Sequence, residues 1–401
     1  MAKSDSRGGP RRDFFETGAM KSNFYSVDWI LPASAVLLVL LGLTAMKSFG
    51  ISAVPGANSD YFFYRQILWF VVGLAIFVFA TSINWDFLKT NSVILLIFYF
   101  ILIGFLIILL FGGFVIRGAA SWYRVYSVEV QPVEIMKVLL VLILAKYFSR
   151  RHVEIARIFH IFVSGTYATI PMILVALQPD FGSAAILVLL WLGMALAGGI
   201  KMRHIVILLL AGIILALVLW QFFLLPYQKT RILAFLEPAR DTRGAGYHAL
   251  QSTIAVGSGE IFGKGIGFGT QSRLSFLPEK ETDFIFAAFA EEWGFVGALI
   301  IFFFFGLLIW RILHAGIYGE SNFEKLYAMG LAILLVAQAS IHIGMNIGLL
   351  PITGLGMPFL SYGGSSLISL FFALGILESF SIHRKGIFLG GSEERFKENI
   401  I

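Results

Sequence analysis

A short acidic stretch beside an apolar region is the first place where this sequence could do chemistry. Residues 277–295 read LPEKETDFIFAAFAEEWGF and carry Asp283, Glu291 and Glu292 as the chain becomes strongly hydrophobic. An acid in or at the edge of a membrane is costly, so it usually serves a function. Asp283 is therefore the candidate catalytic residue, although an aspartate at a helix start can also be a plain N-cap. Glu291 lies nearer to the helical face of Asp283 than Glu292 does, which makes it a candidate supporting residue.

Three further polar motifs fall at the ends of other apolar segments. The motif QPVEIMK places Glu134 and Lys137 three residues apart, on one helical face. QPDFG places Asp180 in a tight turn, and RGAASWYR contains Trp122. Each of these residues could contact a substrate, and each also has a structural interpretation. Glu134 and Lys137 could be a structural ion pair, Asp180 could cap the backbone of its turn, and Trp122 could be an ordinary interfacial aromatic residue.

Two irregular segments add candidates. Residues 226–282 are polar and rich in glycine, and loops of this length are usually functional. They supply cationic candidates for substrate contact: Arg231, Lys264 and Arg273. The segment LLPITGLGMPFLSYGGSS contains Ser361 and cannot be a regular helix; at membrane depth, such backbone is buried in protein or lines a cavity. Asn346, one turn after His342, is a candidate helix-to-helix hydrogen-bonding residue.

The composition indicates what kind of molecule must position these residues. The chain has 401 residues, of which 58% are hydrophobic and 13% charged, whereas a soluble domain carries roughly 25% charged residues. A polytopic membrane protein is expected. There is no cysteine, which excludes thiol nucleophiles, cysteine-ligated zinc and disulfides. No cleavable signal peptide is apparent, because the first apolar segment is too long.

The hydrophobic pattern predicts an all-α fold with ten membrane-spanning helices. Segments on the order of 20 apolar residues are expected at 29–48, 67–84, 91–112, 131–148, 161–178, 183–200, 205–225, 284–310, 327–348 and 363–382. Most Lys and Arg of the short connections lie on the side of the N-terminus, so both termini are predicted in the cytoplasm. One large extracytoplasmic loop then separates the seventh and eighth helices. Topology and solvated faces account for the basic residues, so nucleic acid is not an expected partner.

These elements divide the chain into three parts. Residues 1–27 are expected to be a flexible cytoplasmic arm and residues 386–401 a cytoplasmic tail. Residues 28–385 form the ten-helix membrane domain, in which residues 226–283 are the large outer loop.

Four blocks of this sequence resemble the SEDS family (shape, elongation, division and sporulation), which includes the rod-shape protein RodA and the division protein FtsW. The blocks are QPVEIMK, QPDFGS, the run from GAGYHALQSTIAVGSGEIFGKG to EEWGF, and NIGLLPITGLGMPFLSYGGSS. The resemblance covers residues 25–385, and it is greater to the rod-shape members of the family than to the division members. It implies ten transmembrane helices and a peptidoglycan glycosyltransferase that acts on lipid II during cell elongation. It also implies a complex with a class B penicillin-binding protein.

Matching the motifs position by position, the resemblance assigns the essential aspartate to Asp283, the lysine of the QPSE block to Lys137, and the aspartate of QPD to Asp180. The tryptophan of the family's Arg-Trp pair is Trp122. The arginine of that pair is Ser121 here, and Arg117 or Arg124 could replace it. Val133 for serine and QPDFGS for QPDLGT are further departures, and neither removes a charged candidate.

The implied reaction is chain growth at the outer membrane face, where a sugar hydroxyl displaces undecaprenyl pyrophosphate from a lipid-linked donor. Asp283 is expected to be the general base or a ligand of a hard divalent cation such as Mg²⁺ or Mn²⁺. The nascent glycan and membrane lipid are the other expected partners. Two other functions remain open at this point: a lipid II flippase and a non-catalytic scaffold for the penicillin-binding protein.

Overall fold

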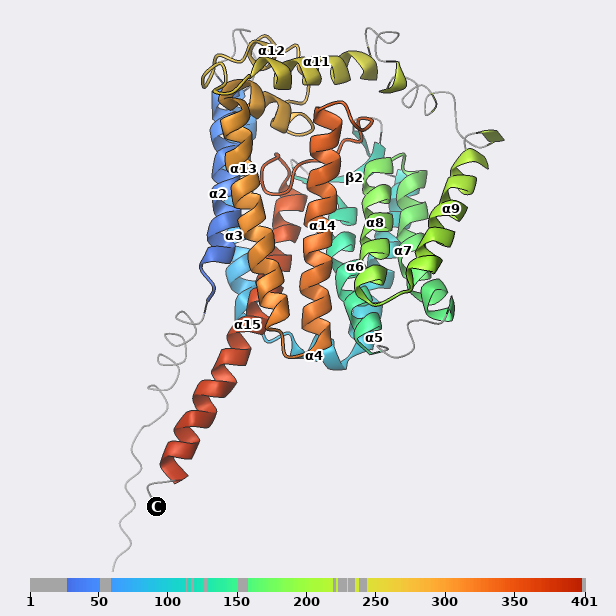
Figure 1. The fold of residues 1–401 in the computed structure, drawn as a ribbon, viewed down its shortest axis with the longest axis vertical. Helices are drawn as coiled ribbons and strands as arrows, with labels where there is room; N and C mark the ends of the chain where they lie inside the picture. The colour runs from blue at the N-terminus through green and yellow to red at the C-terminus, as the bar shows by residue number, and fades with distance from the viewer. Residues whose placement is uncertain are drawn as a thin grey trace, which may run out of the picture.

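A computed structural model describes most of the chain as a bundle of long helices with a cover at one end (Figure 1). The described residues are 27–50, 59–112, 114–116, 119–125, 128–150, 158–218, 221–222, 229, 235–237 and 244–398. The predicted N-terminal arm, apart from its last residue Val27, and Arg231 lie outside these residues.

The long helices account for most of the fold. They are α2 (Ile30–Phe49), α3 (Ser59–Ser82), α5 (Ser92–Gly112), α6 (Pro132–Ser149), α7 (Ile158–Leu177), α8 (Phe181–Ala197), α9 (Met202–Val218), α13 (Ile285–Ile317), α14 (Asn322–Asn346) and α15 (Gly364–Glu398). Shorter helices are α4 (Asp86–Thr90), α11 (Ala245–Ser258) and α12 (Thr270–Arg273). Helix α15 continues far into the predicted tail, because polar residues can extend a helix beyond the apolar run that predicts it.

Within the part of the chain that the structure describes, seven helices are long and apolar enough to cross a membrane: α2, α3, α5, α7, α13, α14 and α15. The other three predicted spans coincide with α6, α8 and α9. Helix α6 is 18 residues long and includes Glu134, Lys137 and Lys146, whereas α8 and α9 have 17 residues each. The polytopic membrane fold is therefore confirmed, and the count of ten spans stays a prediction.

Helix α6 is the central element of the bundle. Of its 18 residues, 15 are buried, and it packs against α5, α7, α8, α14 and α15. A membrane helix that is surrounded by protein can keep charged residues, provided that they are paired. This burial explains why α6 carries three charges and still lies inside the bundle.

Contacts at the two ends of the bundle fix the directions of the helices. Near the start of α2, Asp28 accepts hydrogen bonds from Arg311 at the far end of α13. Near the end of α2, Ser48 donates to Glu292 at the beginning of α13. These helices are therefore antiparallel. Helix α13 begins at the end of the bundle that α11 and α12 cover (Figure 1), and Asp283 directly precedes this helix. We call this end the outer end, following the predicted topology.

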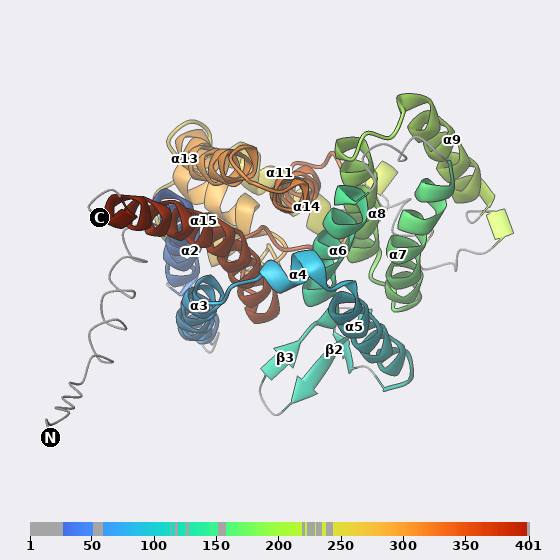
Figure 2. The same ribbon diagram turned by 90° about the horizontal axis from the view of Figure 1, so that it is seen from below.

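The prediction of an all-α protein was wrong for residues 114–116, 119–125 and 128–130. They form three short antiparallel strands in the order β1 (Phe114–Ile116), β2 (Ala119–Val125) and β3 (Val128–Val130). Tyr123 faces Val130 and Arg124 faces Glu129 across the second pair. The segment is too short to span a bilayer, and its valine, isoleucine, tyrosine and tryptophan residues favour strands. The sheet lies beside α5 and α15 (Figure 2) and contributes Trp122 to the outer end.

Helix α13 is broken near its outer end. Gly294 has φ 66° and ψ −162°, a conformation outside the helical region. A turn of the outer segment fills the break: Lys264 N and Gly265 N donate to the carbonyls of Glu291 and Glu292, and Phe295 N and Val296 N donate to those of Glu260 and Ile261. The four N–O distances are 2.9–3.0 Å. We call residues 259–265 the inserted turn. It satisfies backbone groups that the break would otherwise leave unpaired.

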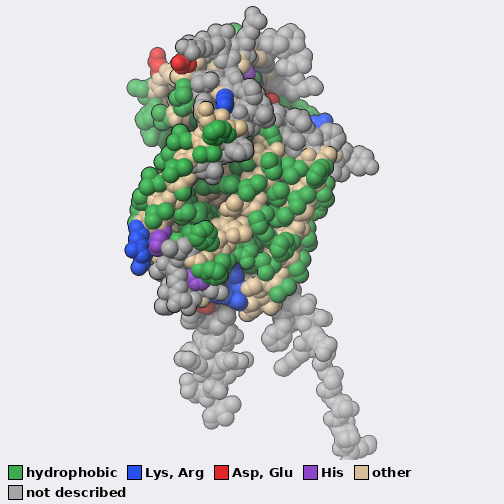
Figure 3. Space-filling model, turned by 90° about the vertical axis from the view of Figure 1, so that its right-hand side faces the viewer, with side chains coloured by type: hydrophobic (Ala, Val, Ile, Leu, Met, Phe, Trp, Pro, Cys, Tyr) green, Lys and Arg blue, Asp and Glu red, His purple; other side chains and the backbone are tan. Residues whose placement is uncertain are grey.

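The surface agrees with a membrane setting. Figure 3 shows hydrophobic side chains over the middle of one face, with Lys, Arg and His side chains at its lower edge. Large apolar side chains such as Phe79, Phe111 and Phe303 are well exposed. In water such a surface would be unfavourable, whereas in lipid it costs nothing.

Candidate active site

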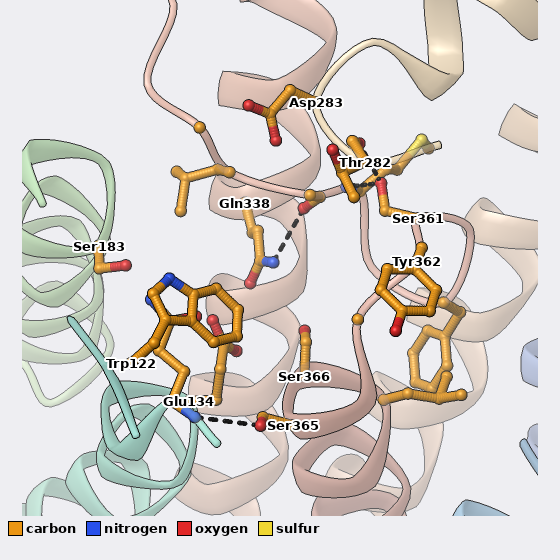
Figure 4. Close-up of a pocket in the computed structure, with 18 residues that line it drawn as sticks. Trp122, Glu134, Ser183, Thr282, Asp283, Gln338, Ser361, Tyr362, Ser365 and Ser366 are labelled. Carbon is orange, nitrogen blue, oxygen red and sulfur yellow. Dashed lines mark hydrogen bonds between the residues drawn. The ribbon is translucent and has the colours of Figure 1, made fainter. Parts of the chain in front are cut away.

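A polar pocket opens among the outer ends of the central helices. It is lined by Trp122, Gln131, Glu134, Ser183, Thr282, Asp283, Gln338, Gly354, Leu355, Gly356, Met357, Phe359, Ser361, Tyr362, Gly363, Ser365, Ser366 and Leu367. Asp283 lies at one end of this pocket and Glu134 and Trp122 at the other, with Gln338 between them (Figure 4). We call it the Asp283 pocket. Residues from segments that are far apart in the sequence meet here, as expected for an active site.

The backbone around Asp283 is held by Asn346. The Nδ2 of Asn346 donates to the carbonyl of Asp283 at 3.0 Å, and its Oδ1 accepts from Ala287 N at 3.1 Å. The N-cap of α13 is Phe284, one residue after Asp283. Asp283 is 7% exposed and lines the pocket. The structure thus places this carboxylate in a cavity, next to the first turn of the helix.

Glu134 and Lys137 form a buried ion pair. Their Oε1 and Nζ atoms are 2.7 Å apart, and the lysine side chain is 1% exposed. The same Nζ lies 3.4 Å from Oε1 of Gln338, whose Nε2 donates to the carbonyl of Gly356 at 3.0 Å. Of the two charged residues, Glu134 lines the pocket and Lys137 lies behind it. Lys137 therefore positions Glu134 and Gln338.

Asp180 caps a helix, as its turn interpretation predicted. Its Oδ1 accepts from Ser183 N at 3.0 Å at the start of α8, and its Oδ2 accepts from Gln131 Nε2 at 3.1 Å. Burial raises the pKa of Asp180, against the opposing effect of the bond from Ser183. Ser183 and Gln131 line the pocket, so Asp180 supports two pocket residues at once.

Trp122 lines the pocket, and the residue before it supplies no cation. Ser121 is 1% exposed, and its Oγ has no hydrogen-bond partner within the described part of the chain. Arg124, one of the two predicted replacements, pairs with Glu129 at 2.7 Å and is half exposed. Arg117, the other one, lies outside the described residues.

The irregular segment before α15 forms one wall of the pocket. Ser361 Oγ donates to the carbonyl of Thr282 at 2.8 Å and accepts from Met357 N at 2.7 Å. Tyr362 N donates to the carbonyl of Glu281 at 2.8 Å. This segment is therefore fastened to the residues just before Asp283, and Ser361 is one of the fasteners.

The outer-loop candidates lie elsewhere. Lys264 Nζ is 2.9 Å from Glu291 Oε1 and 2.9 Å from Thr270 Oγ1, and Arg273 ends α12. Glu291 also accepts from the backbone N–H groups of Gln271 and Ser272. None of Lys264, Arg273 and Glu291 is among the described residues that line the Asp283 pocket. Glu291 holds α12 to α13, so any effect on Asp283 passes through the helix.

Several pocket residues were missed by sequence reasoning. Gln338 stands out because Gln338, His342 and Asn346 recur every four residues and form a polar stripe on one face of α14. Ser183, Ser365, Ser366 and Tyr362 gave no comparable signal, since single serines and tyrosines are common at helix ends. Their role depends on which helix ends meet, which spacing along one chain does not reveal.

The residues that line the pocket supply only some of the ligands that a bound cation needs. Among the described residues there is no group of three or more His, Asp or Glu side chains that could hold a metal ion. The pocket has two carboxylates, and Glu134 is already paired with Lys137. Mg²⁺ is commonly bound by one or two carboxylates together with phosphate oxygens of the substrate. Asp283 fits that arrangement, with the other ligands supplied by substrate and water.

The fold and the pocket define a polytopic membrane protein with a carboxylate site at one end of its bundle. The chain belongs to the family of FtsW, RodA and SpoVE: the family model, described as cell cycle protein, matches residues 28–386. The resemblance seen in the sequence motifs is thereby confirmed.

Individual relatives are similar over nearly the whole chain. The peptidoglycan glycosyltransferase MrdB of Escherichia coli is 36% identical over 350 residues, which cover 87% of this chain and 93% of MrdB. A probable peptidoglycan glycosyltransferase FtsW of Thioalkalivibrio is 36% identical over 374 residues, covering 88% of each chain. Because the sequence identity is 36% both to MrdB and to this FtsW, overall identity does not show which of the two relatives the chain resembles more.

Solved structures share the fold. One is described as "Structural coordination of polymerization and crosslinking by a peptidoglycan synthase complex"; it matches with a TM-score of 0.74 and 28% identity, covering 89% of this chain and 98% of that one. The crystal structure of RodA from Thermus thermophilus matches with a TM-score of 0.65 and 26% identity, covering 88% and 96%.

Proposed function

We propose that this chain is a peptidoglycan glycosyltransferase that polymerises lipid II into glycan strands at the outer face of the bacterial cytoplasmic membrane. Family membership and relatives that carry this activity at 36% identity support the reaction class. The observation that carries the proposal is the position of Asp283, a carboxylate in a polar pocket at one end of a membrane bundle. The prenyl chain of the substrate stays in lipid while its sugars reach this pocket.

In the proposed reaction, the 4-hydroxyl oxygen of an acceptor GlcNAc attacks C1 of the donor MurNAc. The bond between C1 and the phosphate oxygen breaks, and undecaprenyl pyrophosphate leaves with the bonding electrons. Asp283 accepts the hydroxyl proton, which as general base catalysis contributes roughly 10²–10⁴-fold in rate. Because the leaving group is already a pyrophosphate, it needs charge stabilisation and no general acid.

The other pocket residues orient the sugars. Ser366 brings a hydroxyl group to the pocket, and Gln338 brings an amide whose Nε2 is bonded to the carbonyl of Gly356. Trp122 offers an aromatic face on which a sugar ring can pack. Hydroxyl and amide groups of this kind match the hydroxyl and acetamido groups of the substrate.

Binding a divalent cation is the other proposed role of Asp283. Bound by Asp283 and by phosphate oxygens, Mg²⁺ or Mn²⁺ would neutralise charge on the leaving group. The asparagine variant removes both the base and the metal ligand, whereas a chelator removes only the metal.

A polymerisation assay separates these possibilities. Purified protein in liposomes is given lipid II, and glycan chains are separated by size, with and without EDTA. We expect polymer from the wild type and at least a roughly 100-fold loss in Asp283→Asn. Asp60→Asn, which changes a half-exposed carboxylate paired with Lys47 outside the pocket, is the matched control and should keep full activity. Polymer formed at the wild-type rate by Asp283→Asn contradicts the assigned role.

The same assay decides between polymerase and flippase. A flippase moves lipid II across the liposome membrane without lengthening it, and a scaffold does neither. Transporters generally bind substrate near the bilayer midplane, whereas the pocket here lies where α6, α8, α13 and α15 begin. This position favours polymerisation at the membrane surface.

We further propose that the chain works with a class B penicillin-binding protein during cell elongation. The proposal of a partner is supported by the similarity to a solved structure described as a peptidoglycan synthase complex. Co-purification of the full chain with the elongation and the division transpeptidase, each expressed separately, tests both points. Exclusive recovery of the division enzyme would contradict the elongation role.

A further inference from the structure

His342 is a buried histidine that the proposed reaction does not use. It lies on α14 between Gln338 and Asn346 and is 0% exposed. Its Nδ1 lies 2.7 Å from the carbonyl oxygen of Leu355. Because a carbonyl oxygen only accepts hydrogen bonds, Nδ1 carries the proton and donates it. Nε2 is then an acceptor, and it has no hydrogen-bond partner within the part of the chain that the structure describes.

The hydrogen bond from His342 is one of two that fasten an irregular segment to α14. We call residues 353–357 the wall segment; they have neither helical nor strand structure, and residues 354–357 line the Asp283 pocket. The consecutive carbonyls of Leu355 and Gly356 accept from His342 and Gln338, which are four residues apart on one face of α14. The bond from Gln338 is visible in Figure 4. Backbone carbonyls without a regular partner need such donors when they are buried.

The wall segment lies directly beside the carboxylate of Asp283. Gly354 has a φ of 73°, and a Cβ added to it would lie 3.8 Å from Oδ2 of Asp283. At this point the carboxylate faces the backbone of the wall segment, because glycine has no side chain to separate them. A shift of the wall segment would therefore change the space around the carboxylate in which the acceptor hydroxyl must lie.

A second helix confines the wall segment by close packing. A Cβ added to Gly182, at the start of α8, would lie 2.7 Å from the carbonyl oxygen of Thr353 and 2.8 Å from Cγ of Leu355. Packing of this kind limits how near the segment can come to α8, but it does not stop the segment from moving away. The directional bond from His342 to Leu355 supplies that restraint.

We propose that His342 is a positioning residue: its Nδ1–H, acting through the carbonyl of Leu355, holds the wall segment against the carboxylate of Asp283. This assignment rests on the proposed function. His342 is not among the described residues that line the Asp283 pocket, so its effect on the reaction passes through Leu355 and Gly354. A general base must lie within hydrogen-bond reach of the proton that it removes. A misplacement of about 1 Å can cost on the order of 100-fold in rate.

Two amide variants distinguish the Nδ1 donor from the rest of the ring. In His342→Asn the side-chain nitrogen can occupy the position of Nδ1, whereas in His342→Gln it reaches the position of Nε2. Full-length protein in liposomes is given lipid II, and rates are expressed per folded protein. We expect His342→Asn to keep kcat within about threefold of the wild type, and His342→Gln to lose roughly 10- to 100-fold in kcat with little change in KM.

The matched control is His160→Gln. His160, at the start of α7, is also buried, and its Nδ1 is bonded to the hydroxyl of Tyr147 at 2.8 Å. It lies outside the Asp283 pocket, so His160→Gln should keep the wild-type kcat per folded protein.

Hydrogen exchange measures the positioning without relying on activity. In nanodiscs, peptides that cover residues 351–360 should exchange their amide hydrogens faster in His342→Gln than in the wild type, whereas His342→Asn and His160→Gln should match the wild type. Unchanged exchange in His342→Gln, or faster exchange together with a wild-type kcat, would overturn the proposal. Equal losses of kcat in His342→Asn and His342→Gln would also overturn it. Exchange that responds as expected in a protein that forms no polymer would show that the proposed function alone has failed.

Discussion

Lys137 shows how burial decides the role of a single residue. From its motif, a lysine near the outer membrane surface could contact a phosphate directly. In the structure its ammonium group is buried and bonded to Glu134 and Gln338. A buried charge whose partner is removed is strongly unfavourable, because neither water nor another ion compensates it. The essential property of Lys137 is therefore that it pairs with Glu134 and holds that side chain in place.

A double-mutant cycle tests this role. Lys137→Met leaves Glu134 buried without its partner, and we expect a loss of about 3–5 kcal/mol in the free energy of unfolding. Glu134→Gln combined with Lys137→Met removes both charges and should recover most of that loss. Chemical denaturation in detergent, with activity measured on the folded fraction, checks both values. Additive losses in the double variant would show that the two residues do not act as a pair.

At the scale of the elements, the apolar runs of the sequence predicted where helices lie, but they did not predict where a helix is interrupted. The predicted span at 284–310 coincides with α13, which in fact extends from Ile285 to Ile317. The break at Gly294 was not predicted, because a glycine inside an apolar helix is usually tolerated. Its cause is the inserted turn, which comes from the outer segment earlier in the chain. Long-range backbone pairing of this kind leaves no periodic signal in either segment.

The inserted turn and the break fit each other too closely for a side chain. An added Cβ on Gly294 would lie 2.3 Å from Gly263 N, and one on Gly263 would lie 2.1 Å from the carbonyl oxygen of Glu292. The break separates the short outer part of α13, which follows Asp283, from its long membrane part. The outer segment thereby controls where the outer part of α13 points, and hence where Asp283 lies.

Alanine substitutions test this coupling. Gly294→Ala should cost roughly 2–4 kcal/mol of stability and lower polymerisation, because the conformation of Gly294 is almost restricted to glycine. Gly306→Ala on the same helix is the matched control. Apart from the neighbouring backbone of its own helix, no heavy atom lies within 4 Å of its added Cβ, and alanine has the higher helix propensity by about 1 kcal/mol. Thermal unfolding and the lipid II assay measure both variants, and equal behaviour of the two would refute the coupling.

From the sequence, the predictable site residues were those whose charge is energetically costly to place in a membrane. Asp283, Glu134 and Lys137 stand out in an apolar chain because an unpaired charge there would be expelled. Residues that complete the pocket at little cost, such as Ser365 and Gly354, do not stand out. The predicted outer-loop cations illustrate the opposite error: Lys264 is charged and lies in the segment before Asp283, yet it binds Glu291 outside the Asp283 pocket.

At the scale of the whole molecule, function depends on which end of the bundle faces outward. The end where α13 begins, next to Asp283, is covered by α11 and α12 (Figure 1). Toward the opposite end of the bundle lie Lys89 in α4, Arg150 after α6, Arg311 in the last turns of α13 and Lys325 in the first turn of α14. Positive charge in short connections marks the cytoplasmic side. By this rule, Asp283 is predicted to face the outside of the cytoplasmic membrane, where the proposed reaction takes place.

Because the sequence has no cysteine, single introduced cysteines can report this orientation without background. Thr253→Cys lies on the exposed surface of α11, and Glu320→Cys lies in the exposed connection between α13 and α14, at the other end of the bundle. We expect a membrane-impermeant maleimide to label Thr253→Cys in spheroplasts and to label Glu320→Cys only after the membrane is opened. Retained polymerisation activity in each variant is the control for native folding. The reverse labelling pattern would place Asp283 in the cytoplasm, where a polymerase of exported lipid II could not work, and would contradict the proposed function.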